Sequence, residues 1–111
     1  MQEAEKKPSI PSYRRHVLLC AGKHCDPEGV RALVHYFRER LRLLGLLDTE
    51  VRLNRAGCLG VCREGAIACI YPDGVWYCRI DAAAVDRIIR HHLIGGAVVE
   101  ELLFHHHRPP A

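Results

Sequence analysis

The fold is indicated by residues 14–45, which read "RRHVLLCAGKHCDPEGVRALVHYFRERLRLLG". The apolar run that ends at Cys20 predicts a buried strand, and a loop that contains a glycine leads to Cys25. The pattern then predicts a helix over about residues 27–44, because the apolar residues recur at steps of three, four and seven. Gly45 follows, a residue typical of a helix end. This stretch therefore predicts a strand, a loop with a cysteine at each end, and an amphipathic helix.

The rest of the chain predicts a second strand, a hairpin and a second helix. Residues 48–55, "DTEVRLNR", alternate apolar and polar side chains, as a strand does. Residues 66–80, "AIACIYPDGVWYCRI", contain two strand-forming runs around a turn. Asp81 can cap a helix that ends near residues 95–96, and His92 on its inner face is expected to be a packed side chain rather than a ligand. We expect an α/β domain with a four-stranded mixed sheet and two main helices.

Length and composition favour one globular domain inside the cell. The chain has 111 residues, of which 49% are hydrophobic and 26% charged. No apolar stretch reaches the roughly 20 residues that cross a bilayer, and the polar start does not resemble a signal peptide. We therefore expect a cytoplasmic protein without a membrane partner, with a flexible tail over residues 1–13, the domain over 14–104 and a second tail over 105–111. The formal charge of +3 is too weak to favour a nucleic-acid partner.

Four of the six cysteines form two pairs at comparable places in the predicted fold. Cys20 and Cys25 read C-x4-C, and Cys58 and Cys62 read C-x3-C. One strand–helix–strand unit separates the pairs, and a right-handed crossover would make the two strands parallel. Both loops should then open at the same edge of the sheet. Thiolates suit zinc and iron–sulfur clusters, and these gaps fit either, since structural zinc sites use about two to four intervening residues.

A family resemblance is carried by four segments of the chain. They are "HVLLCAGKHCDPEG" (16–29), "AGCLGVC" (56–62), "YPDGVWY" (71–77) and "HLIGG" (92–96). Together these segments resemble the thioredoxin-like 2Fe–2S ferredoxins over about residues 14–104. The resemblance implies a thioredoxin-like fold and a 2Fe–2S cluster whose ligands are Cys20, Cys25, Cys58 and Cys62. It also implies transfer of single electrons between redox partner proteins, a reductase and an electron acceptor, and a homodimer. Many ferredoxins are acidic, whereas this chain is slightly basic.

The two remaining cysteines, Cys69 and Cys78, lie on the two arms of the predicted hairpin. A two-residue turn would place them opposite each other. A three-residue loop over residues 72–74 would instead place Cys69 opposite Tyr77 and Cys78 opposite Ala68. The order proline, aspartate, glycine suits a type I turn followed by a left-handed glycine, so we expect the second register and two separate thiols.

Two features near the chain end allow more than one interpretation. Trp76 and Tyr77 are adjacent in a predicted strand, so one of them should point outward, either as part of ordinary sheet packing or as part of a partner surface. The run His105–His107 could be a solvated tail, the trace of a tag or a weak metal site.

The sequence favours an electron carrier over two other functions. A structural zinc module that serves protein interaction would use the same four cysteines. Thiol–disulfide exchange is disfavoured because the C-x-x-C motif is missing. We expect no enzymatic activity, because the sequence contains no nucleotide-binding fingerprint, no suggested nucleophile–base pair and no paired carboxylates near the cysteines.

Overall fold

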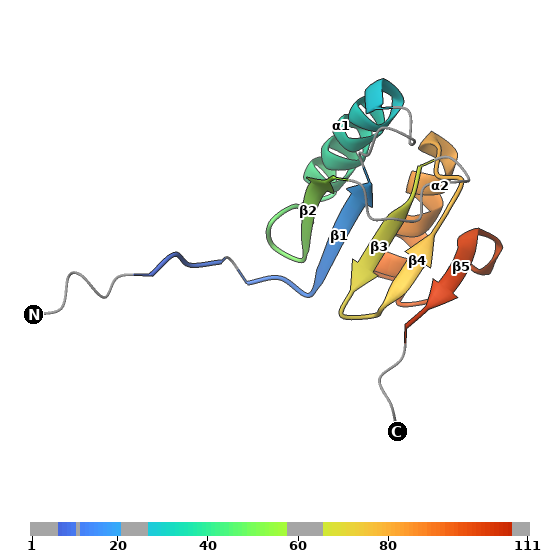
Figure 1. The fold of residues 1–111 in the computed structure, drawn as a ribbon. Helices are drawn as coiled ribbons and strands as arrows, with labels where there is room; N and C mark the ends of the chain where they lie inside the picture. The colour runs from blue at the N-terminus through green and yellow to red at the C-terminus, as the bar shows by residue number, and fades with distance from the viewer. Residues whose placement is uncertain (1–6, 11, 21–26, 58–65, 108–111) are drawn as a thin grey trace, which may run out of the picture.

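The computed structural model describes residues 7–10, 12–20, 27–57 and 66–107, without the side chains of Pro27 and Glu28. The described residues form one mixed sheet with helices packed on it, as Figure 1 shows. The elements in chain order are β1 (Arg15–Cys20), α1 (Pro27–Leu43), β2 (Val51–Ala56), β3 (Ala68–Tyr71), β4 (Val75–Tyr77), α2 (Ala82–Arg87), η2 (Ile88–Ile94), η3 (Glu100–Leu102) and β5 (Leu103–His106). The predicted α/β architecture with two main helices is confirmed.

The strands are ordered β2-β1-β3-β4-β5 across the sheet. β1 and β2 are parallel, and their register runs from Arg15 opposite Val51 to Cys20 opposite Ala56. The other three pairings are antiparallel. A parallel pair requires a crossover connection, and α1 supplies it between β1 and β2. The two strands therefore end side by side at one edge of the sheet.

One face of the sheet carries the hydrophobic core. Val17, Leu53 and Ile70 are buried there, and α1 contributes Phe37 and Leu41, both fully buried. This explains the predicted period of α1, because the apolar stripe faces the sheet while most of its charged residues face water. Both α1 and α2 lie on this face of the sheet (Figure 1).

The second helix begins where the sequence predicts, with Asp81 as its cap. The Asp81 carboxylate accepts a hydrogen bond of 2.8 Å from the backbone N–H of Ala84. The helix continues from α2 into the π-helical turns of η2 and ends at Gly95 and Gly96, of which Gly96 has a φ of 78°. No helix in the described part of the chain is long and apolar enough to cross a membrane.

The sheet has five strands rather than the four expected from the sequence. β5 pairs antiparallel with β4, with His105 opposite Trp76 and His106 opposite Val75. Placing residues 105 and 106 in a C-terminal tail is therefore wrong. The sequence of β5, Leu-Phe-His-His, does not alternate apolar and polar residues, so the pattern did not predict a strand. The strand is held by its backbone pairing with β4.

The expected hairpin register, with Cys69 opposite Tyr77, is wrong by one step, and the alternative two-residue turn would be wrong by two steps. Cys69 lies opposite Trp76, and Ile70 lies opposite Val75, so four residues separate the last paired positions. The backbone N–H of Gly74, which has a φ of 73°, donates a hydrogen bond of 2.8 Å to the carbonyl of Ile70 and closes this longer turn. Cys69 and Cys78 are still not opposite each other, and both are free thiols, as predicted.

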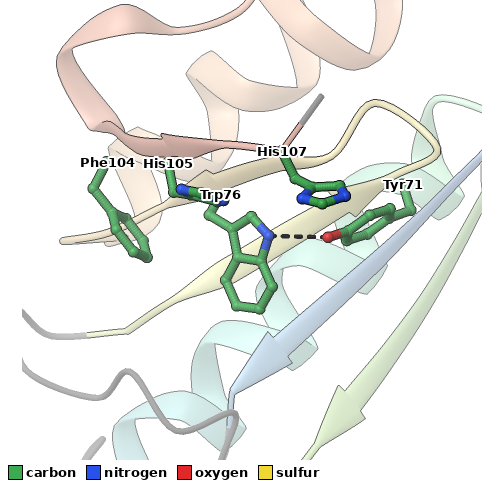
Figure 2. Close-up of a pocket in the computed structure, with 5 residues that line it drawn as sticks. All are labelled: Tyr71, Trp76, Phe104, His105 and His107. Carbon is green, nitrogen blue, oxygen red and sulfur yellow. Dashed lines mark hydrogen bonds between the residues drawn. The ribbon is translucent and has the colours of Figure 1, made fainter. Parts of the chain in front are cut away.

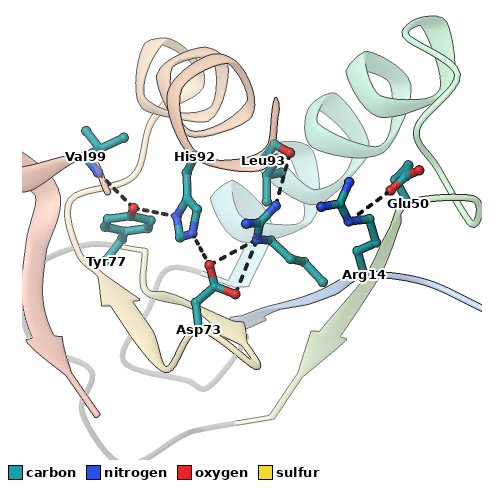
Figure 3. Close-up of polar contacts among 8 residues, drawn as sticks. Arg14, Glu50, Asp73, Tyr77, His92, Leu93 and Val99 are labelled. Carbon is teal, nitrogen blue, oxygen red and sulfur yellow. Dashed lines mark hydrogen bonds and ion pairs between the residues drawn. The ribbon is translucent and has the colours of Figure 1, made fainter. Parts of the chain in front are cut away.

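A buried polar network fastens the hairpin turn to η2, as Figure 3 shows. Asp73 accepts hydrogen bonds from Arg15 Nε at 3.0 Å and from His92 Nε2 at 2.7 Å. The other ring nitrogen of His92 lies 2.7 Å from the hydroxyl of Tyr77, which accepts a bond of 3.0 Å from the N–H of Val99. The network is satisfied when Tyr77 donates to Nδ1 and Nε2–H donates to Asp73. His92 is thus a packed side chain, as expected.

The network determines how Asp73 contributes to stability. Burial alone would raise the pKa of Asp73, but the hydrogen bonds from His92 and Arg15 and the charge of Arg15 outweigh burial and lower it. A carboxyl group whose pKa is lowered by folding stabilises the fold fully above its ordinary pKa of 3.8. That stabilisation is lost as the pH falls through the lower, folded-state pKa.

We expect Asp73→Asn to lower the free energy of unfolding at pH 7 by about 1–3 kcal/mol, because Arg15 loses its anionic acceptor and the amide of Asn offers only one oxygen to the donors Arg15 and His92. Urea unfolding monitored by circular dichroism measures this loss. The pH profile gives a second signature, because the variant should lose less stability than the wild type as the pH falls below about 4.

A suitable control is Glu50→Gln, whose carboxylate pairs with Arg14 at 3.6 Å on the surface. The Glu50 side chain is 45% exposed, so its loss should change the free energy of unfolding by less than about 0.5 kcal/mol. Equal effects of the two substitutions would contradict the role given to the buried network.

Candidate functional site

The structure brings the starts of the two predicted cysteine loops to the same edge of the sheet. Cys20 is the last residue of β1 and lies opposite Ala56, the last residue of β2. In the sequence, Cys58 comes two positions after Ala56, and Cys25 comes two positions before Pro27, where α1 begins. Cys25, Cys58 and Cys62 themselves lie outside the described residues.

Cys20 lies between the two described ends of the segment that contains Cys58 and Cys62. On one side is Ala56, which leads through Gly57 into that segment. On the other side is Ile67, whose carbonyl accepts a hydrogen bond of 2.9 Å from the backbone N–H of Cys20. Because β1 lies between β2 and β3, the described residues that flank positions 58–65 in the sequence lie on the two sides of Cys20.

The donor set at this edge fits a thiolate-bound metal group. Cys20 is 0% exposed and belongs to the buried core cluster. Cys20 provides a buried sulfur at a strand end, and the sequence has three further cysteines in the two segments that adjoin it; thiolates are the soft ligands that zinc and iron–sulfur clusters take. Among the described residues alone, no group of three or more histidine, cysteine or acidic side chains could hold a metal ion. Any such site must therefore use the cysteine-bearing segments.

Relatives and solved structures of known type share this architecture. The chain is 34% identical over 88 residues to a 2Fe–2S ferredoxin of Clostridium pasteurianum, covering 72% of this chain and 85% of the relative. It is 31% identical to a 2Fe–2S ferredoxin of Aquifex aeolicus, covering 87% and 95%. No protein-family model matches the chain.

The crystal structure of the thioredoxin-like [2Fe–2S] ferredoxin from Aquifex aeolicus aligns with a TM-score of 0.76 and 29% identity. The alignment covers 85% of this chain and 99% of that one. The chain belongs to the thioredoxin-like 2Fe–2S ferredoxin family. It is a one-electron carrier with a 2Fe–2S cluster as its cofactor, and nothing in these relatives supports the alternative of a zinc module.

Two cysteines of this ferredoxin, Cys69 and Cys78, are buried thiols that do not belong to the predicted ligand pairs. Cys69 is 2% exposed and Cys78 is 8% exposed. Burial, together with the nearby charge of Cys20, raises the pKa of the Cys69 thiol to about 11. The thiol of Cys78 donates to the carbonyl of Leu102 at 3.6 Å. Both side chains therefore pack as small hydrophobic groups, and sequence spacing already separated them from the other four.

The ferredoxin also has an aromatic depression that sequence patterns did not reveal. It measures about 420 Å³ and is lined by Tyr71, Trp76, Phe104, His105 and His107, drawn in Figure 2. Trp76 Nε1 donates to the hydroxyl of Tyr71 at 3.1 Å, and its ring meets that of Phe104 edge-on, with 6.4 Å between centroids. Tyr77 contacts His92 on the helix side, so the adjacent Trp76 points to the opposite face of the sheet.

We expect Cys69 and Cys78 to resist alkylation in the folded protein. With a pKa of about 11, only about one Cys69 in a thousand is a thiolate at about pH 8, and burial blocks access as well. Mass spectrometry after treatment with iodoacetamide should find both residues unmodified. The same treatment in guanidinium, which exposes both thiols, should modify both. Rapid modification of Cys69 without denaturant would contradict the described burial.

Proposed function

We propose that Cys20, Cys25, Cys58 and Cys62 hold the 2Fe–2S cluster of this ferredoxin. The observation that carries the proposal is the position of Cys20, between Ala56 in β2 and the carbonyl of Ile67 before β3. When bound by four thiolates, such a cluster accepts and donates one electron at a time.

The chain's own residues hold and shield the site. The backbone of Cys20 is fixed on both sides, by the parallel register with β2 and by its hydrogen bond to Ile67. The core beneath it, including the fully buried Leu19 and Phe37, keeps water from the helix side of the strand end. A fixed backbone limits the movement of the ligands when the cluster gains or loses an electron. Exclusion of water helps to set the reduction potential.

The electron donor and the electron acceptor are separate redox proteins, because a carrier takes electrons from one protein and gives them to another. We further propose that the chain has no catalytic activity of its own and acts in the cytoplasm. The free thiols of Cys69 and Cys78 suit a reducing compartment, and the given sequence contains no nucleotide-binding fingerprint.

We expect Cys20→Ser, Cys25→Ser, Cys58→Ser and Cys62→Ser each to lower cluster content, because a hydroxyl is a poorer ligand for iron than a thiolate. The wild type should contain about two irons and two sulfides per chain and show visible absorption that weakens on reduction with dithionite. Iron and sulfide analysis and visible spectra measure both.

Cys69→Ala and Cys78→Ala serve as matched controls, since both remove a thiol that the structure places in the packing. They should keep the wild-type spectrum and iron content. The assignment of the four cysteine ligands would be contradicted if the wild type contained stoichiometric zinc and no visible band. It would also be contradicted if Cys69→Ala lost the cluster while the four serine variants kept it.

The homodimer is a second proposal, and the aromatic depression supports it. This surface lies on the sheet face opposite α1 and α2, and Phe104 at its edge is 43% exposed. Exposed aromatic side chains around a concave surface are typical of protein interfaces, because they bury a large apolar area with few lost rotamers. A second copy of the chain is the partner that we assign to this face.

We expect Phe104→Asp to weaken the dimer at least about tenfold, because it would bury an unpaired charge in the interface. Sedimentation equilibrium measures the dissociation constant. Ile94→Asp is a matched control, since Ile94 is 58% exposed on η2, an element of the helix layer. A monomeric wild type at micromolar concentration, or equal effects of the two substitutions, would count against this interface.

A further inference from the structure

A groove with four basic side chains lies between α1 and β2. It measures about 380 Å³ and is lined by Arg31, Val34, His35, Arg38 and Arg55. Three of the basic residues follow one stripe of α1 at steps of four and three, and the fourth comes from the neighbouring strand. All four basic residues are exposed, whereas Val34 is buried. We call this surface the basic groove.

The basic groove adjoins the edge at which the cluster is proposed to lie. Arg55 lies opposite Leu19 in β1, one step before the pairing of Ala56 with Cys20. Arg31 lies about one turn into α1, whose first residue follows the segment that contains Cys25. Figure 1 shows the N-terminal end of α1 and the arrowheads of β1 and β2 at the same end of the domain. A protein bound in the basic groove would therefore sit beside the cysteine-bearing segments.

Among the described residues, no acidic partner is found for the arginines of the basic groove, whereas several arginines elsewhere have one. Elsewhere, Arg15 pairs with Asp73, Arg40 with Asp86, and Arg87 with Glu101. Glu39, which follows Arg38 in α1, pairs with Arg42 at 2.7 Å. Within the described residues, no carboxylate forms an ion pair with Arg31, Arg38 or Arg55. Positive charge is thus concentrated here, although the whole chain carries only +3.

We propose that the basic groove docks an acidic surface of a redox partner protein. The inference rests on the proposed cluster site, because the basic groove matters for electron transfer only if the cluster lies at this edge. Guanidinium groups bind carboxylates through paired hydrogen bonds, and clustered positive charge speeds the encounter with an acidic protein. The described lining has four basic groups and no tyrosine, phenylalanine or tryptophan, so it suits carboxylates on a protein better than stacked bases.

The first experiment measures binding of a fluorescein-labelled poly-L-glutamate peptide to the holoprotein by fluorescence anisotropy. The groove variant is Arg31→Gln, Arg38→Gln and Arg55→Gln combined. The control variant removes the same charge elsewhere through Lys7→Gln, Arg14→Gln and Arg90→Gln, all exposed positions. We expect the dissociation constant to rise about tenfold in the groove variant and less than about twofold in the control. Circular dichroism checks that both variants fold.

The second measurement tests whether the basic groove lies near the part of the surface through which the cluster passes electrons to an oxidant. Stopped-flow mixing follows oxidation of the reduced protein by ferricyanide, an anion, and by hexaamminecobalt(III), a cation; each takes one electron. We expect the groove variant to slow the reaction with ferricyanide about tenfold relative to that with the cobalt complex. The control variant should leave this ratio within about twofold of the wild type.

Each alternative gives a distinct result that would overturn the proposal. Equal effects of the two variants would mean that only net charge matters. If a DNA duplex bound more tightly than the peptide, the basic groove would be a nucleic-acid surface. If inorganic phosphate displaced the peptide more than sodium chloride does at equal ionic strength, the basic groove would be a small-anion site. A changed reduction potential with unchanged peptide binding would show that the arginines act on the cluster alone. A preparation without a cluster would contradict the proposed function, whereas the peptide assay would still test the surface.

Discussion

The parallel pairing of β1 with β2 is the constraint on which the site depends. A right-handed crossover through α1 brings the second strand alongside the first, so that Cys20 and Ala56 end in register. β1 has β3 on its other side, and the carbonyl of Ile67 binds the N–H of Cys20 there. Both ends of the segment with Cys58 and Cys62 are therefore anchored beside Cys20. An antiparallel arrangement of the same two strands would place the two cysteine loops at opposite edges of the sheet.

The two faces of the sheet have separate roles. The helix side is filled mainly by apolar side chains, and a polar network in which Asp73 joins Arg15 to His92 lies on the same side. The other side has the aromatic depression around Trp76, with Phe104 exposed at its edge. The six cysteines also fall into two groups. Cys69 and Cys78 are buried thiols within the sheet and its connections. Cys20 ends β1, and the other three cysteines follow the ends of β1 and β2 in the sequence.

Charge is distributed unevenly over a chain whose net charge is small. Arg15, Arg40 and Arg87 are matched by acidic partners, so they contribute little to the long-range field. Arg31, Arg38 and Arg55 are unmatched within the described residues and lie at the edge that adjoins the cysteine segments. A cluster held by the four proposed ligands would add negative charge close to them. The sign of the field at this edge would then depend on these arginines more than on the net charge of the protein.

The sequence by itself determined the local elements and the chemistry of the ligands. The period of α1, the apolar run of β1, the Asp81 cap and the spacing of the four cysteines are properties of neighbouring residues, and they predict structure because the helix and strand repeats are local. Only the tertiary structure decided the fifth strand, the hairpin register and the partners of His92. β5 is held by backbone pairing rather than by an apolar pattern, and the turn at Asp73 is fixed by Arg15, a residue 58 positions away. Such contacts depend on which segments the fold brings together, and no short stretch of sequence records them.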